Sequence, residues 1–224
     1  MVVARGERTM KRCSWCGQDE LYCRYHDEEW GVPVYDDRKH FEFMVLESAQ
    51  AGLSWLTILR KREAYRTAYA GFDPQVVADY GEAQIKELLE NPGIVRNERK
   101  IRASLNNARR FLEVQEAFGS FSDYLWAFVG HRPVVNAWQQ EREIPAQTAL
   151  SVAISKDLKQ RGFQFLGPII IYSHLQATGL VNDHVVDCFR YQEIIAQGEN
   201  NRGSKEGMRI ACGNYLGRNG IITG

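Results

Sequence analysis

The stretch FEFMVLESAQAGLSWLTIL, residues 41–59, decides the fold. It is mostly apolar, which is typical of a helix buried on all sides, yet it carries two carboxylates, Glu42 near its start and Glu47 further in. At helical spacing the neighbours of Glu47 are Phe43, Met44 and Ala51, so the acid projects from an apolar face. A buried carboxylate needs a partner. Either backbone or an internal ion pair satisfies Glu47, or a ligand does.

A corner between two helices follows this acid. Gly52 predicts the end of the first helix and Ser54 the N-cap of the next, with Trp55 directly after it. An acid and a large ring at such a corner would suit a pocket for a flat, polar, aromatic ligand.

Composition narrows the class of protein. The chain has 224 residues with 28 basic and 28 acidic side chains, so its net charge gives no overall attraction for nucleic acid. A nucleic-acid partner would need a local patch of basic side chains. Its apolar runs are shorter than a membrane span, and the first residues lack the apolar core of a secretory signal. Five cysteines in such a chain are typical of a reducing, cytoplasmic setting, where thiols serve metals.

The pattern beyond the opening stretch predicts an all-α fold. We expect an N-terminal extension over residues 1–10, one globular unit over 11–192 and a flexible Gly- and Asn-rich tail over 193–224. Residues 13–35 show no sustained period and predict an irregular segment, and residues 132–136 are too short to count as a strand. Helices are expected at 36–51, 54–70, 74–79, 82–90, 96–117, 121–129, 148–161, 168–178 and 182–190.

Two cysteines and two histidines have the chemistry of a metal site. His184 and Cys188 are four residues apart and, on a helix, would share one face; Cys13 and His26 lie in the irregular segment. Two sulfurs and two imidazoles suit four-coordinate structural zinc, which would join the two ends of the chain. The alternative is an ordinary helical histidine and a buried free thiol, and Cys16 could compete with Cys13 as a ligand.

A second unit, residues 148–179, predicts a helix, a short hairpin and another helix. Gly162 suits the end of the first helix, Phe163 belongs to the hairpin, and Gly167 precedes a proline that opens the second helix. Backbone N–H groups at such a helix start can bind a phosphate. The alternative is an ordinary corner between helices that binds nothing. A basic cluster at Arg96–Arg110 lies all round its helix and indicates a solvated face.

Aromatic residues are concentrated around His26. Tyr22, Tyr25 and Trp30 flank it, and aromatic side chains often simply pack. Together with Glu47 and Trp55 they would also suit a cage of the size of one nucleobase.

Several of these motifs, taken together, resemble the bacterial 3-methyladenine DNA glycosylase I family. The matching segments run in order from about Lys11 to Cys188, and they are CSW at 13–15, YCRYHDEEWGVP at 22–33, LESAQAGLSW at 46–55, RGF at 161–163 and GLVNDH at 179–184. The resemblance implies a helix-hairpin-helix DNA glycosylase fold with a zinc-stapled lobe formed by both chain ends. It places one structural zinc on Cys13, His26, His184 and Cys188.

The resemblance also implies an activity and its residues. The expected reaction is hydrolysis of the N-glycosidic bond of 3-methyladenine in alkylated double-stranded DNA, by a monomer acting in base-excision repair. Glu47 and Tyr25 would be catalytic, Tyr22, Trp30 and Trp55 would hold the base, and Gly162, Phe163 and Gly167 would hold phosphate. We expect an ionised Glu47, and we give Asp183 no main catalytic role.

Three other functions fit parts of the pattern. A non-catalytic binder of alkylation damage would use the same pocket without releasing the base. A zinc hydrolase would need three protein ligands and a bound water. A zinc-dependent interaction module would leave the acid and the aromatic residues unexplained.

Overall fold

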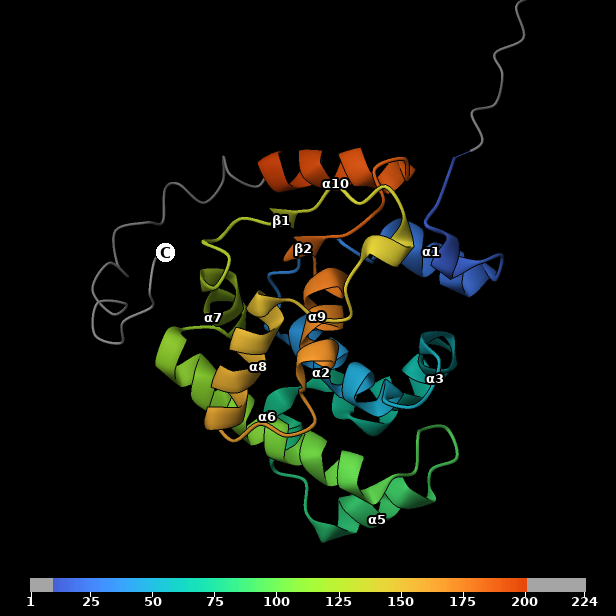
Figure 1. Ribbon diagram of the computed structural model, residues 1–224. Helices are drawn as coiled ribbons and strands as arrows, with labels where there is room; N and C mark the ends of the chain where they lie inside the picture. The colour runs from blue at the N-terminus through green and yellow to red at the C-terminus, as the bar shows by residue number, and fades with distance from the viewer. Residues whose placement is uncertain (1–9, 201–224) are drawn as a thin grey trace, which may run out of the picture.

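The computed structural model describes residues 10–200, and they form a helical protein with one pair of very short strands (Figure 1). This confirms the predicted fold class. The α-helices are α1 Glu20–Glu28, α2 Asp37–Gln50, α3 Trp55–Ala68, α4 Pro74–Ala78, α5 Glu82–Glu90, α6 Glu98–Phe118, α7 Phe121–Ala127, α8 Ala149–Gln160, α9 Pro168–Ala177 and α10 Phe189–Asn200. The strands are β1 Val134–Val135 and β2 Val181–Asn182, and short 3₁₀ turns occupy Ser14–Cys16, Ala70–Phe72 and Glu141–Glu143.

Helix α2 is the centre of the fold. Every residue from His40 to Ala49 is buried, because the helix packs against α3, α6, α7 and α9 on different sides. Rings stack beneath it, with the centroids of Phe111 and Phe121 4.2 Å apart. Figure 1 shows α2 and α9 side by side in the middle, α5 and α6 at one end, and α10 across the strands at the other.

Both ends of α2 are held by side chains. Asp36 caps the first turn by accepting from the Lys39 amide, and the Lys100 ammonium donates to the carbonyls of Ala49 and Ala51 at the last turn. The next helix begins as predicted, because the Ser54 hydroxyl accepts from the Thr57 amide. The corner that carries Glu47 and Trp55 is therefore fixed at both helices.

The helices expected from residue 36 to residue 178 are present within about two residues of their predicted ends. The prediction was wrong on α1, because residues 13–35 were expected to be irregular throughout. Asp19 caps this helix by accepting from the amides of Leu21 and Tyr22. The helix is short and buries Tyr25 and His26 while its other faces stay partly exposed. Its sequence therefore shows no sustained periodic pattern of apolar residues.

The prediction of a helix at 182–190 is also wrong. Val181 and Asn182 pair in parallel with Val134 and Val135, and the Asn182 side chain then accepts from the His184 amide. These bonds keep the backbone extended, so α10 begins only at Phe189.

The limits expected for the globular unit need one correction. Helix α10 runs to Asn200, past the predicted boundary at Gln192. Most of the expected N-terminal extension, residues 1–9, and residues 201–224 of the expected tail lie outside the described residues. Between residues 10 and 200, none of the helices has the length and apolarity needed to cross a membrane.

Candidate active site and metal centre

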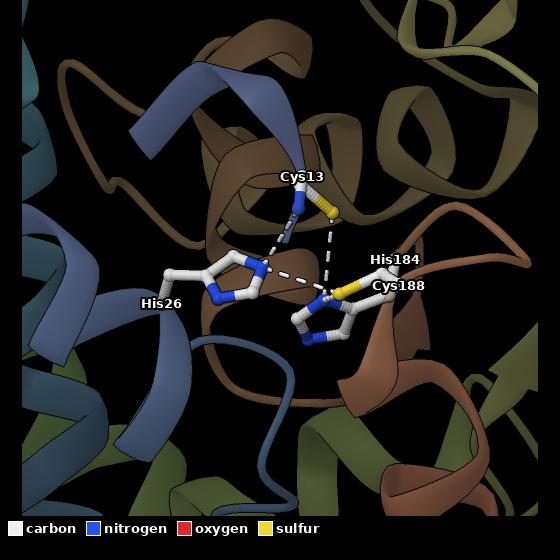
Figure 2. Close-up of side chains that lie close together, drawn as sticks. All are labelled: Cys13, His26, His184 and Cys188. Carbon is white, nitrogen blue, oxygen red and sulfur yellow. Dashed lines mark hydrogen bonds between the residues drawn. The ribbon is translucent and has the colours of Figure 1, made fainter. Parts of the chain in front are cut away.

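Cys13, His26, His184 and Cys188 meet at one buried point near the two ends of the described chain (Figure 2). Their ligand atoms all lie within 4.8 Å of one another. The Sγ atom of Cys188 is 3.4 Å from Nε2 of His26 and 3.5 Å from Nδ1 of His184, and Sγ of Cys13 is 3.6 Å from that same Nδ1. A tetrahedral zinc would place such sulfur and nitrogen atoms about 3.6 Å apart. The four donors therefore fit a closed tetrahedral metal site.

The outward nitrogens of both imidazoles have partners that fix their orientation. Nδ1 of His26 lies 2.8 Å from the Asp27 carboxylate, which Arg12 also contacts, and Nε2 of His184 lies 3.0 Å from the Trp30 carbonyl. Because these oxygens accept, each ring turns its unprotonated nitrogen toward the cluster. The hydrogen bond from the Cys13 thiol lowers the pKa of Cys188 well below its usual value. A thiolate is the form that binds metal.

The route by which the ligands converge differs from the prediction. His184 and Cys188 do not share a helix face; they lie in the turn between β2 and α10, where the Cys188 amide donates to the Val185 carbonyl. Cys16 does not compete for the site, since its thiol donates to the Cys13 carbonyl. Four buried protein donors leave no position for a bound water, which contradicts the zinc-hydrolase alternative.

Beside this cluster, aromatic rings of α1, α2 and α3 form a second buried group. The Tyr25 ring lies 5.6 Å from Trp55, and the Phe43 ring stacks against Trp55 at 6.4 Å with an interplanar angle of 18°. Trp30 and Tyr22 join it through Trp15, whose ring is 5.1 Å from Trp30 and 5.0 Å from Tyr22. Of the predicted base-binding residues, Trp55 contacts Tyr25 directly, whereas Trp30 and Tyr22 contact it through an intervening ring.

Glu47 interacts electrostatically with Tyr25 of this aromatic group and has one internal hydrogen-bond partner. Its Oε2 atom is 2.8 Å from Nδ1 of His174 on α9, while Oε1 is buried without a partner. Burial raises the pKa of Glu47 well above its usual value, and the charge of Glu47 contributes to a raised pKa of the buried Tyr25. The apolar surroundings therefore favour the neutral acid when no cation lies beside Glu47, and an ionised Glu47 opposite a cationic base stays a prediction.

Two buried polar atoms in the predicted pocket lack hydrogen-bond partners among residues 10–200. They are Oε1 of Glu47, an acceptor, and Nε1 of Trp55, a donor. Leaving such atoms unpaired costs about 1–3 kcal/mol each, so they point to a ligand that supplies the missing bonds. The contact of Glu47 with His174 occupies only one of the two carboxyl oxygens and does not close the site.

A cavity between the first three α-helices is a different place. It has a volume of about 510 Å³ and lies between α1, α2 and α3, with Tyr25 and Phe43 on one wall and Arg24, Lys39 and Arg62 among its other lining residues. Glu47 and Trp55 do not line it. Three of its cations pair with neighbouring acids, namely Lys39 with Glu29, Arg62 with Glu29 and Glu42, and Arg66 with Glu42.

The hairpin between α8 and α9 is present, but two of its predicted phosphate contacts have other partners. The Gly162 amide donates to the Lys159 carbonyl and the Phe163 amide to the Leu158 carbonyl, and the Phe163 ring is buried in the core. Asn107 of α6 braces the hairpin through both the amide and the carbonyl of Gln164, each at 2.8 Å. Of the three predicted residues, Gly167 at the start of α9 is the one whose amide donates to no backbone carbonyl among the described residues.

Asp183 is a buried carboxylate that holds the fold together. It accepts hydrogen bonds from the side chains of Asn136, Trp138, Tyr172 and Gln176. Four donors use its lone pairs, which agrees with our expectation that Asp183 has no main catalytic role.

Comparison with known proteins identifies the family. A family model described as methyladenine glycosylase matches residues 15–191. DNA-3-methyladenine glycosylase 1 of Escherichia coli K12 is 50% identical over 182 residues, covering 81% of this chain and 97% of that protein. The Haemophilus influenzae DNA-3-methyladenine glycosylase is 44% identical, covering 79% and 96%. A Staphylococcus aureus 3-methyladenine DNA glycosylase I structure, on recognition of 3-methyladenine, superposes with a TM-score of 0.79 at 40% identity, covering 81% and 97%.

The helical fold and the site of stacked rings around one acid are those of a DNA glycosylase, and the comparisons narrow the class further. The chain belongs to the methyladenine glycosylase family, which confirms the resemblance seen in its motifs.

Sequence reasoning gave no role to three residues that build the site, although it had named Phe43 as a helical neighbour of Glu47. His174 contacts Glu47, His40 contacts His174, and Phe43 stacks on Trp55. The role of Phe43 could have been predicted, because it precedes Glu47 by one helical turn. His174 is 127 positions from Glu47 and His40 is 134 from His174, and no spacing in the sequence relates them.

Proposed function

We propose that this protein removes 3-methyladenine from alkylated double-stranded DNA by hydrolysing the N-glycosidic bond, which releases the free base and leaves an abasic site for base-excision repair. The observation that carries the proposal is the pair of unpartnered polar atoms, on Glu47 and Trp55, in a wall of aromatic rings. Family membership supports the choice of base and reaction.

The protein mainly has to select the damaged base and hold it in place. Methylation at N3 makes adenine cationic and weakens its bond to the sugar, so an attacking water completes the reaction without a strong nucleophile. The flipped cation stacks on Trp55 and gains about 1–2 kcal/mol from cation–π attraction. Glu47 accepts from the adenine edge, Tyr25 bonds beside it, and Trp30 and Tyr22 close the site through Trp15.

The damaged strand is held outside this pocket. The start of α9 at Gly167 presents backbone N–H groups and the positive end of the helix dipole to a phosphate. Arg99 lies over the Phe165 ring of the same hairpin, 5.9 Å from its centroid, and adds positive charge there. We place the DNA backbone along this edge.

The metal in this proposal is one structural zinc. Cys13, His26, His184 and Cys188 would hold it, and it would join the segment before α1 to the start of α10. The Phe189 amide also donates to the Lys11 carbonyl across this junction. We propose a monomer acting in the cytoplasm, with the zinc taking no part in bond cleavage.

The first prediction concerns Glu47→Gln. A glutamine keeps the shape of Glu47 and donates its amide to Nδ1 of His174, so the fold and DNA affinity should persist. It cannot become negative, so release of 3-methyladenine from alkylated DNA should fall about 100-fold. Chromatography of the free base under single-turnover conditions measures this, with binding followed by fluorescence anisotropy.

Two outcomes would contradict this assignment. Equal loss of binding and release would mean that Glu47 supports the fold rather than the reaction. If the unmodified protein binds alkylated DNA and releases no base, it is the non-catalytic damage binder considered from the sequence.

A further inference from the structure

The two buried histidines behind Glu47 form a continuous hydrogen-bonded chain that ends on a backbone carbonyl. Nε2 of His40 lies 3.2 Å from the Val34 carbonyl oxygen, Nδ1 of His40 lies 3.2 Å from Nε2 of His174, and Nδ1 of His174 lies 2.8 Å from Oε2 of Glu47. All three residues are at most 3% exposed. The chain crosses from α9 to the beginning of α2 and has no described contact with the metal cluster.

The carbonyl end determines which atoms carry protons. A carbonyl only accepts, so Nε2 of His40 must be protonated. When His40 is neutral, its Nδ1 accepts and Nε2 of His174 donates to it. When His174 is also neutral, its Nδ1 accepts, and the only donor available is a protonated Glu47. An ionised Glu47 facing a neutral His174 of this tautomer would set two lone pairs against each other at 2.8 Å.

Glu47 can therefore ionise without disrupting the chain only if its proton moves along it. The proton passes from Oε2 of Glu47 to Nδ1 of His174, giving a carboxylate beside an imidazolium whose two N–H groups both have acceptors. In a second step Nε2 of His174 gives its proton to Nδ1 of His40. The number of protons is the same in all three states, and no exchange with solvent is needed.

We propose that His174 and His40 are positioning residues that store the proton of Glu47 while a cationic alkylated base occupies the pocket. This rests on the proposed function of Glu47 as the acid that faces the base. Glu47 is neutral when no cationic base lies beside it. Binding of the cation favours the carboxylate form of Glu47. When the base leaves uncharged after cleavage, the proton returns to Glu47 and the site is restored.

Burial and neighbouring charges are consistent with this sequence of states. Burial lowers the pKa of both His40 and His174 to about 3 and raises that of Glu47, which favours the all-neutral chain in the empty site. The charges of Asp37 and Asp36 act in the opposite direction on His40, so they favour the proton at the far end of the chain.

Other charged groups on the packed elements have partners of their own. Arg62 and Arg66 of α3 pair with Glu42, and Lys100 of α6 binds the carbonyls at the end of α2. Tyr25 of α1 is the titratable group that faces Glu47, and burial raises its pKa, so it stays neutral. A cationic ligand is thus the charge that can shift the proton.

The test is the pH dependence of base release by a His174→Gln variant of the full-length protein. Glutamine can bond to Glu47 but cannot take its proton, so Glu47 must then lose the proton to water. Because burial raises the pKa of Glu47 well above its usual value, the acid stays protonated in this variant at neutral pH. We expect release by the variant to be about 10-fold to 100-fold slower at about pH 7 and to rise with pH. The unmodified protein should change little between about pH 6 and about pH 8.

His131→Gln is the matched control, because His131 is exposed, and it should behave as the unmodified protein. A pH profile of His174→Gln that coincides with the unmodified profile would overturn the proposal. If His174→Gln fails to fold, ¹⁵N-imidazole spectra of the unmodified protein decide. We use the cation 3,9-dimethyladeninium, which has a methyl group in place of the sugar. When it binds, the proton of Glu47 should move to His174 or His40, so that both nitrogens of one imidazole are protonated. Neutral 3-methyladenine should leave both imidazoles neutral. Spectra in which the protonation of both imidazoles is unchanged with the cation bound would overturn the proposal.

These outcomes separate the proton store from the proposed function. If Glu47→Gln releases base as fast as the unmodified protein, the role of Glu47 itself fails. If Glu47→Gln is slow but His174→Gln keeps the unmodified rate and profile, the role of Glu47 stands and the proton store alone fails.

Discussion

At the scale of the residue, the site depends on polar atoms that the fold buries and leaves unpaired. Glu47 shares one oxygen with His174 and keeps the other free, and the indole N–H of Trp55 has no partner among the described residues. Burying such atoms costs folding free energy. A ligand that fills both bonds recovers that cost, which explains how the same residues can be unfavourable for stability and useful for recognition.

Close packing at one glycine gives a prediction at this scale. Gly179 has a φ of +70°, and a Cβ atom there would lie 2.5 Å from the backbone of Pro33. Gly179→Ala should therefore lower the free energy of unfolding by about 2–4 kcal/mol. Gly119→Ala is the control, because Gly119 has a φ of +87° with open space around it and should lose about 1 kcal/mol from backbone strain alone.

Urea unfolding of both variants measures the difference. Equal destabilisation of the two would show that the close approach to Pro33 is absent in solution.

At the scale of the element, rigid helices set the geometry and short segments carry the contacts. The opening stretch could be predicted because residues 43–46 of α2 are continuously apolar and its neighbour begins with a serine cap. The helix α1 and the strand pair could not, since Tyr25 and His26 face partners far away in the sequence and β1 and β2 are two residues each. Long-range hydrogen bonds, such as Val134 to Leu180, leave no periodic signal.

The hairpin between α8 and α9 gives a prediction about DNA binding. Asn107→Ala would leave the Gln164 amide and carbonyl without their partner, so the hairpin should loosen. We expect affinity for DNA to fall about 10-fold while base release at saturating DNA stays near normal. Fluorescence anisotropy and single-turnover release measure the two quantities.

Asn106→Ala provides a graded control, since it removes one bond to the Gly162 carbonyl. It should weaken binding less than Asn107→Ala. A loss of release without loss of affinity in either variant would place the hairpin in the pocket rather than on the DNA backbone.

At the scale of the whole molecule, the metal cluster links the two ends of the described chain around the helical core. The four residues of this cluster could be named from the sequence through the family resemblance, since spacing alone left Cys16 as an alternative, and the backbone that brings them together could not be predicted. The contacts by which Asp27 and the Trp30 carbonyl orient the two imidazoles could likewise not be predicted before the fold was known. Closing a loop of this length constrains the unfolded chain strongly.

Removal of the metal tests this link. We expect one zinc per chain by atomic absorption, and a strong chelator should lower the melting temperature by about 10 °C or more. Cys188→Ser should abolish metal binding, whereas Cys16→Ser, at the thiol that faces the Cys13 carbonyl, should keep it. Acidification should release zinc as its ligands are protonated. A stoichiometric metal in Cys188→Ser would contradict the assignment.

The central claim is that a single damaged base sits between the aromatic rings and Glu47. The most direct measurement is a crystal structure of the protein soaked with 3-methyladenine. We predict the base stacked on Trp55, with its edge about 3 Å from Oε1 of Glu47. A base bound instead in the 510 Å³ cavity beside Arg24, with Oε1 of Glu47 still unpaired, would contradict the account.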